Sequence, residues 1–283
     1  MRVYLRKNSH VPASNKTQVS ELFRASKTGL ISVGAAAAAL RVSRTVASSR
    51  LARLVGSGWA VRVRRGMYLI LPLDARPDQK ATAEDPWVLA RELFSPCYIG
   101  GWSAAEHWGL TEQLFRSTFV VTAAPVRRAH ATVLGNEFRL FAVRPPKAAN
   151  GILQVWRGAE QVAVSGPERT LVDCLDAPEL CGGVRHLAQM LREYGQSEKK
   201  DFLRLLAIAS TVGSGAAWKR LGYLAEVLWP DDAVIPSAAR PRLSAGYARL
   251  DPAVRQRGRL LTRWRVWVNV DPKELGAAPA RAS

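Results

Sequence analysis

Side chains that can bind phosphate are concentrated at the start of this chain. Residues 1–72 contain thirteen lysines and arginines and one acid, Glu21, which gives +12 of a total net charge of +18. Residues 73–239 hold 18 basic and 19 acidic residues, and residues 240–283 hold ten and three. Charge segregated in this way indicates a polyanionic partner at one end of the molecule, and DNA or RNA is the usual candidate.

Three of these arginines surround a predicted hairpin, where they would meet a phosphate backbone. The β-prone runs 59–63 and 67–72 flank Arg64-Arg65-Gly66. Gly66 can adopt the positive φ that a tight turn requires. Arg62, Arg64 and Arg65 would then cluster on a two-stranded wing that binds phosphates.

The residues before the hairpin predict three short helices. Apolar residues recur at helical spacing in Gln18–Lys27. Ser32 can cap a second helix that ends at Leu40, and Ser43 can cap a third that runs to about residue 57. Three helices and a basic hairpin in this order are typical of a winged helix-turn-helix, whose last helix enters the major groove. The N-terminal domain is therefore predicted to bind DNA.

The third helix has an apolar and a polar face, because successive residues turn by about 100°. The residues expected to face the core are Val46, Ala47, Leu51 and Leu54. The opposite face is small and polar, as a face that reaches base edges would be, although a merely solvated face is the alternative. The residues predicted to bind DNA on this helix and the wing are Arg44, Thr45, Ser48, Ser49, Arg53, Arg62, Arg64 and Arg65.

A polar segment that contains Pro77 predicts a domain boundary. We expect a flexible basic arm at 1–16, the winged helix-turn-helix at 17–74, a linker at 75–85, a C-terminal domain at 86–275 and a tail at 276–283. Within the C-terminal domain, β-prone runs lie at 119–123, 138–143, 152–156 and 161–164, and helical runs lie at 184–194, 199–209 and 216–228. This mixture predicts the α+β class, with a winged helix-turn-helix followed by a larger mixed domain.

Two local patterns in the C-terminal domain predict specific contacts. Ser165-Gly-Pro-Glu168 matches a capping box, and Arg169 is spaced to pair with Asp173. Residues 263–270 alternate like a half-buried strand. Because Trp264 and Trp267 alternate with arginines there, two interpretations remain: tryptophans of the core, or an aromatic and cationic surface for single-stranded nucleic acid.

Few residues are spaced for catalysis. Glu106 and His107 are adjacent, so on a helix they point in different directions. Asp173 with Glu198-x-Lys200 faintly resembles the acid-acid-x-Lys pattern of nucleases, but these residues are predicted on helices and not on strands. The chain has no phosphate-binding loop and no nucleophile-elbow motif. We therefore expect no catalytic residues and no enzyme activity.

The composition predicts a cytoplasmic protein without a cofactor. The three cysteines and four histidines are scattered, so neither a disulfide framework nor a metal site is expected. Charged residues interrupt every apolar stretch before it could span a bilayer, and the N-terminus lacks the apolar segment of a signal peptide.

Several stretches taken together resemble the AbiEi family of antitoxins and autorepressors. They are Leu51-x-x-Leu54 through Arg64-Arg65-Gly66-Met67-Tyr68, Gly101–Thr111 (GWSAAEHWGLT), Pro167–Asp173 (PERTLVD), Arg220–Glu226 (RLGYLAE) and Trp264–Asn269 (WRVWVN). The resemblance spans about residues 30–270. It implies a winged helix-turn-helix that binds inverted repeats in its own promoter, and a C-terminal antitoxin domain.

The resemblance also implies the partners. Besides double-stranded DNA, they would be a nucleotidyltransferase-like toxin that is antagonised without a stable complex, as in type IV toxin–antitoxin systems. We expect a monomer or weak dimer. The charge of the tail points to an antitoxin surface made of Arg240, Arg242, Arg255, Arg257, Arg259, Arg263 and Arg265. The alternatives are a winged-helix regulator that senses a small molecule and a DNA-targeted nuclease.

Overall fold

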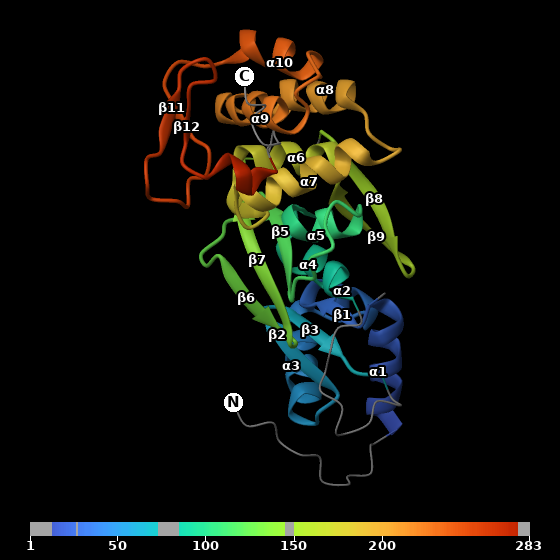
Figure 1. Cartoon of the computed structure of the whole chain (residues 1–283). Coiled ribbons are helices and arrows are strands. Elements are labelled where there is room, and N and C mark those ends of the chain that lie inside the picture. The colour runs from blue at the N-terminus through green and yellow to red at the C-terminus, as the bar shows by residue number, and fades with distance from the viewer. Residues whose placement is uncertain (1–12, 27, 73–84, 145–149, 277–283) are drawn as a thin grey trace. The chain divides into compact units, whose positions relative to one another are not determined.

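The computed structural model describes residues 13–26, 28–72, 85–144 and 150–276, which form two units of helices and strands (Figure 1). The first unit comprises residues up to Glu92 together with 132–136, and the second comprises the remainder. The predicted α+β class is confirmed. Residues 1–12 of the predicted arm, residues 75–84 of the linker and residues 277–283 of the tail lie outside the described residues.

The first unit contains a winged helix-turn-helix. Its elements are α1 (Ala13–Ala25), β1 (Leu30–Ser32), α2 (Val33–Ala39), α3 (Arg44–Gly56), β2 (Ala60–Arg64) and β3 (Met67–Ile70), and α4 (Pro86–Phe94) follows. The strands form an antiparallel sheet in the order β1-β3-β2. Since α1 begins at Ala13, residues 13–16 belong to the first helix and not to the arm in which we expected them.

Serine side chains begin the second and third helices, as predicted. Ser32 Oγ accepts a hydrogen bond from the Ala35 amide at 3.1 Å, and Ser43 Oγ accepts one from the Val46 amide at 3.3 Å. Each bond satisfies an amide that the first turn of a helix leaves without an intrahelical partner. The two caps therefore fix where α2 and α3 start.

The core of the winged helix-turn-helix includes one face of α3. Ala47, Leu51 and Leu54 are buried there, as predicted, and pack with residues of α1, α2 and the sheet. Val46 was expected in this core but is 41% exposed. Residues 47, 51 and 54 already form the contact face at i, i+4 and i+7, and Val46 points about 100° to one side of it.

The second unit is built on a mixed sheet in the order β6-β7-β5-β4-β9-β8. The strands are β4 (Cys97–Ile99), β5 (Ser117–Thr122), β6 (His130–Val133), β7 (Asn136–Ala142), β8 (Ile152–Arg157) and β9 (Glu160–Ser165). The pairs β4–β9 and β5–β7 are parallel, whereas β4–β5 and β8–β9 are antiparallel. The predicted strands at 119–123, 138–143, 152–156 and 161–164 are confirmed, and the last two pair as a hairpin. Strands β4 and β6 were not predicted.

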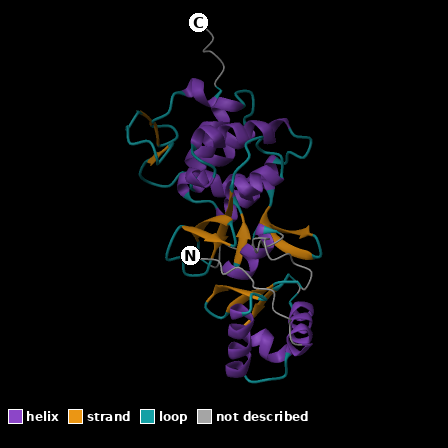
Figure 2. Ribbon diagram, turned by 90° about the horizontal axis from the view of Figure 1, so that it is seen from below, coloured by secondary structure: helices purple, strands orange, loops and turns teal. Residues whose placement is uncertain are grey.

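Most helices of the second unit gather into a layer of their own (Figure 2), and α5 packs against both α6 and β5. The helices of this unit are α5 (Gly101–His107), α6 (Pro167–Asp176), α7 (Val184–Gln196), α8 (Phe202–Val212), α9 (Gly215–Leu228) and α10 (Val234–Ala239), with single turns η2 (Pro178–Leu180), η3 (Arg240–Arg242) and η4 (Pro272–Leu275). A second, small sheet has the strand order β10-β12-β11. Its strands are β10 (Ala248–Arg249), β11 (Arg259–Leu261) and β12 (Val266–Val268). The helices predicted near 184–194, 199–209 and 216–228 are confirmed.

Two predictions for the second unit were wrong. Ser165 does not cap α6: it ends β9, its hydroxyl bonds Thr170 Oγ1 at 2.7 Å, and α6 starts after Gly166 with Pro167 in its first turn. The predicted strand 263–270 is reduced to Val266–Val268. Arg265 has φ +53°, a left-handed conformation that a strand cannot contain, so the chain turns there before β12 begins.

Candidate nucleic-acid interface

The exposed side of α3 carries the polar residues predicted to reach bases. Arg44, Thr45, Ser49 and Arg53 are exposed, and Ser48 is half-buried. The Ser49 hydroxyl donates a hydrogen bond to the Thr45 carbonyl at 3.2 Å, which leaves its oxygen able to accept one from a partner. Exposed Val46 adds an apolar group that the helical periodicity had assigned to the core.

The predicted wing is formed by β2, β3 and their turn. Arg62, Arg64 and Arg65 are all exposed on it. Gly66 has φ +78°, and its carbonyl accepts a hydrogen bond from the Val33 amide at 3.0 Å, which ties the turn to the start of α2. The Arg64 guanidinium donates a long bond, 3.4 Å, to the Glu92 carbonyl. The wing therefore holds its arginines on a backbone anchored to the helices.

The surface formed by α3 and the wing carries charges of one sign. Five arginines, Arg44, Arg53, Arg62, Arg64 and Arg65, are exposed on α3 and the wing. The sequence from Val33 to Ile70 contains no aspartate or glutamate, so no carboxylate of these elements neutralises them. A cluster of this kind suits a phosphate backbone, because arginine binds phosphate oxygens through several donors at once.

Asp173, part of the weak nuclease pattern, is committed to a buried network. Its Oδ1 accepts from Arg169 Nε at 2.8 Å, as the spacing predicted, and its Oδ2 accepts from Tyr98 Oη at 2.9 Å. Burial raises the pKa of Asp173, against the attraction of Arg169, and burial beside Asp173 raises the pKa of Tyr98. Glu198 and Lys200 are exposed before α8. Both oxygens of Asp173 are thus used in packing α6 on β4.

The other acid–base candidates are also accounted for. Glu168 is buried and accepts from Tyr194 Oη at 3.0 Å, so it acts in packing and not in a capping box. Glu106 and His107 lie at the exposed end of α5. Burial, followed by the charge of Arg157, lowers the pKa of His107. Within the described part of the chain, no cluster of His, Cys, Asp and Glu is arranged to hold a metal ion.

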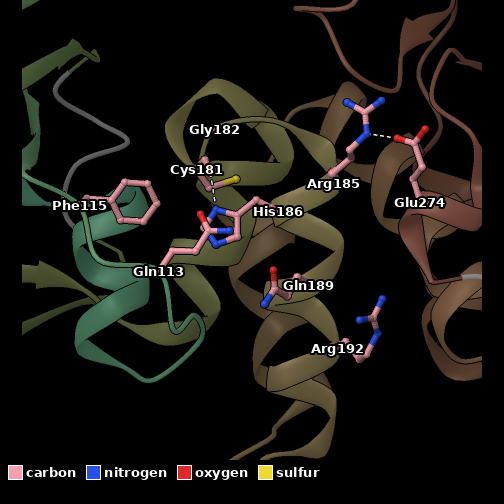
Figure 3. Close-up of a pocket in the computed structure, with 9 residues that line it drawn as sticks. All are labelled: Gln113, Phe115, Cys181, Gly182, Arg185, His186, Gln189, Arg192 and Glu274. Carbon is pink, nitrogen blue, oxygen red and sulfur yellow. Dashed lines mark hydrogen bonds and ion pairs between the residues drawn. The ribbon is translucent and has the colours of Figure 1, made fainter.

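A pocket of about 380 Å³ lies in the second unit beside α7 (Figure 3). Its cations are Arg185, ion-paired with Glu274 of η4, and Arg192, which donates to the Leu275 carbonyl at 3.0 Å. Phe115 forms an aromatic wall against His186, with ring centroids 5.8 Å apart. The complete lining is Gln113, Phe115, Cys181, Gly182, Arg185, His186, Gln189, Arg192 and Glu274.

His186, at the centre of this pocket, has a partner for each ring nitrogen. Nδ1 lies 2.5 Å from the Cys181 carbonyl, and Nε2 lies 2.7 Å from Thr111 Oγ1. A carbonyl oxygen only accepts, so Nδ1 donates to Cys181, and Nε2 shares a hydrogen bond with the threonine hydroxyl. His186 therefore supports the pocket wall, and the pocket is suited to binding a small polar molecule more than to acid–base chemistry.

The arginines of the tail fall into three groups, of which the first, Arg242 and Arg265, donate to the Ala238 and Ser244 carbonyls at 2.9 and 3.0 Å. Arg263 bonds Glu226 at 2.8 Å, and Arg240 lies 3.9 Å from the same carboxylate. Four others, Arg249, Arg255, Arg257 and Arg259, are exposed and make no ion pair within the described ranges. The sequence pattern could not separate the groups, because Glu226 lies on α9, far away along the chain.

Sequence reasoning also missed the role of Arg220 on α9. It is buried and donates to four carbonyls, those of Leu175 and Asp176 at 2.7 and 2.9 Å and those of Arg249 and Leu250 at 3.1 Å. The first two are carbonyls at the end of α6, which lack helical partners. Arg220 therefore joins α6, α9 and β10. The only signal in the sequence was an arginine on an otherwise apolar helical face.

The comparisons with known proteins agree with this two-part architecture. Residues 18–70 match the family described as "Transcriptional regulator, AbiEi antitoxin", and residues 98–227 match "AbiEi antitoxin C-terminal domain". The chain belongs to the AbiEi antitoxin family. This AbiEi chain is also similar to the solved structure of the RV2827C protein from Mycobacterium tuberculosis, with a TM-score of 0.56, 18% identity and 93% of each chain covered. That likeness shows a shared fold.

No curated protein matches this AbiEi chain. No helix among the described residues is both long and apolar enough to cross a bilayer.

Proposed function

We propose that the first unit binds the promoter DNA of its own operon and represses transcription. Helix α3 would enter the major groove, and the wing would lie along the phosphates. The observation that supports this best is the joint exposure of five arginines on α3 and the wing, without a carboxylate between Val33 and Ile70. In this proposal each half of an inverted repeat takes one protein, as a monomer or weak dimer.

The proposal is tested by titrating the full-length protein onto its own promoter fragment and onto random duplex of equal length. The double variant Arg64→Ala/Arg65→Ala should weaken binding to both, since phosphates carry no sequence information. Thr45→Ala should weaken binding to the promoter and leave the random duplex unaffected. Equal losses on both duplexes for both variants would refute this division of roles.

We further propose that the second unit counteracts a nucleotidyltransferase-like toxin without a stable complex and without enzymatic activity of its own. The match to the AbiEi antitoxin C-terminal domain supports an antitoxin role. We assign its working surface to the tail arginines, all of which are exposed: Arg240, Arg242, Arg255, Arg257, Arg259, Arg263 and Arg265.

Growth of a bacterial host that expresses the neighbouring toxin gene tests this half of the proposal. The full-length protein and its Arg64→Ala/Arg65→Ala variant should both restore growth, because the wing serves repression. Reversing Arg255, Arg257 and Arg259 to glutamate should abolish rescue. The same reversal at Arg116, Arg127 and Arg128, which are exposed elsewhere in the second unit, is the matched control. Rescue by every variant would show that the tail arginines are not required for antitoxin activity.

The pocket beside α7 favours a second candidate, a regulator that senses a small anionic molecule. Arg192 supplies positive charge, because Arg185 is already paired with Glu274. Gln113 and Gln189 supply amide groups, and Phe115 supplies a flat wall. A volume of about 380 Å³ is within the range of small-molecule sites. Nucleotides added to the promoter-binding assay test it: a shift in affinity that Arg192→Ala removes would favour sensing, and no shift with any nucleotide would reject it.

A further inference from the structure

One face of the small sheet carries an exposed row of aromatic, aliphatic and cationic side chains. Trp267 of β12 pairs with Arg249 of β10 and with Leu260 of β11. Residues directly opposite in adjacent strands point to the same side of a sheet. Arg249 is exposed, and Trp267 and Leu260 are half-buried, so this side of the sheet faces solvent.

Two further residues extend the row. The Arg257 guanidinium lies 4.7 Å from the Trp267 ring centroid, within the range of a cation–π contact. The ring of Tyr247 is 58% exposed and stands at 61° to Trp267, with centroids 6.4 Å apart. We call the surface formed by Tyr247, Arg249, Arg257, Leu260 and Trp267 the tail platform.

Trp264 and Trp267 follow the same sequence pattern but differ in burial. Trp264 is fully buried and lies against Gly222 of α9, so it belongs to the core. Trp267 is left partly open beside an exposed tyrosine. Part of the Trp267 ring is therefore accessible to a stacking partner.

The charge around the tail platform is not neutralised locally. Arg255 precedes Arg257 by two residues, and like Arg249 and Arg257 it forms no ion pair with any residue that the structure describes. Arg259 pairs with Val268, so it points to the other side of the sheet. The one acid between Arg240 and Val270 is Asp251, which is buried and accepts from the Val184 and Ala253 amides at 3.0 and 2.9 Å. Three arginines, Arg249, Arg255 and Arg257, therefore remain available to an anionic partner on this side of the sheet.

We propose that the tail platform binds single-stranded RNA. Unpaired bases stack on Tyr247 and on the Trp267–Arg257 pair, while the flanking arginines hold the phosphates. Stacking on aromatic side chains requires bases that are not already stacked in a duplex, and a basic groove with aromatic rings is the usual design of single-strand binders. RNA is the polynucleotide that presents unpaired bases in its loops, bulges and ends. This inference rests on neither the repressor nor the antitoxin role.

The test uses the full-length Arg64→Ala/Arg65→Ala variant, in which the wing no longer competes for nucleic acid. Fluorescence anisotropy follows its titration onto labelled twelve-nucleotide oligo(U), oligo(dT) and a duplex DNA of random sequence. Binding of oligo(U) should be at least tenfold tighter than binding of the duplex. Equal affinity for oligo(U) and the duplex would show that the surface attracts any polyanion through its charge alone, and would overturn the proposal. Equal affinity for oligo(U) and oligo(dT) would overturn the assignment to RNA.

Point variants with matched controls locate the site. Tyr247→Ala should weaken oligo(U) binding about 5- to 150-fold, the range measured for the loss of one stacked base. Tyr247→Phe should retain binding, because the ring is kept. Trp156→Ala removes another exposed aromatic residue, 65% exposed on β8, and should have no effect.

A second pair of variants tests the phosphate contacts. Arg249→Ala should weaken binding, whereas Arg263→Ala, which removes an arginine already paired with Glu226, should not. Equal losses from Tyr247→Ala and Trp156→Ala, or from Arg249→Ala and Arg263→Ala, would place the RNA elsewhere and overturn the proposal. Circular dichroism of each variant shows that the fold is kept.

Discussion

Arg169 and Asp173 stand one turn apart on α6 and form an ion pair of 2.8 Å that is almost completely buried. Arg169 also donates to the Tyr98 hydroxyl at 3.0 Å and to the Asn150 carbonyl at 2.5 Å, and Tyr98 in turn donates to Asp173. Because these partners lie on β4, α6 and the segment before β8, one network joins three separate parts of the second unit.

Removing one member of this pair should destabilise the second unit strongly. Asp173→Ala is expected to lower the free energy of unfolding by about 3–5 kcal/mol, since the charge of Arg169 stays buried without its carboxylate. The control is Glu274→Ala, which removes one partner of the exposed pair Arg185–Glu274 and should cost at most about 1 kcal/mol. Urea denaturation measures both, and similar losses would contradict the assigned role of burial.

Trp264 packs directly on the backbone of Gly222, so a larger residue there should be poorly tolerated. A Cβ at Gly222 would collide with the indole, and Gly222→Ala is expected to cost about 1–3 kcal/mol despite the better helix propensity of alanine. In a Trp264→Leu background the same substitution should cost less, because the colliding ring is gone. A double-mutant cycle by denaturation checks this; additive losses would show that the two residues do not interact.

The wing should determine how strongly DNA binding depends on salt. An arginine that no longer binds its phosphate is expected to reduce the slope of log K against log[salt] by about 0.9. Arg64→Ala/Arg65→Ala should therefore flatten the slope by roughly 1 to 2, with Arg116→Ala in the second unit as the control. Binding measured between low and moderate salt tests this. An unchanged slope in the double variant would show that Arg64 and Arg65 of the wing do not contact DNA phosphates.

Exposed Val46 should contact a thymine methyl group in the promoter. Val46→Ala is expected to weaken promoter binding about 5- to 10-fold and to leave random duplex unaffected, because the valine would touch a base and not the backbone. Replacing promoter thymines by uracil one at a time should reproduce the loss at one position with the wild type and not with the variant. A loss of equal size on random duplex would speak against base recognition.

The N-terminal domain could be predicted from sequence because its signals are local. The serines that cap α2 and α3, the periodicity of α3 and the glycine of the wing turn all act within a few residues. Val46 was wrongly assigned to the core because helical periodicity shows which face of a helix is the most apolar, but not how wide the buried part of that face is. The predicted capping box at Ser165 was wrong for a related reason: the four-residue motif does not show that Ser165 is still part of the preceding strand.

By itself, the sequence determined the winged helix-turn-helix, the one-sided charge of its surface, most helices of the second unit and the membership of a family. These depend on spacing along the chain. Only the tertiary structure decided which tail arginines are paired, which tail tryptophan is buried and that Arg220 joins α6 to β10. Those outcomes depend on contacts between residues far apart in sequence, and burial and charge compensation are properties of such contacts, which no local pattern records.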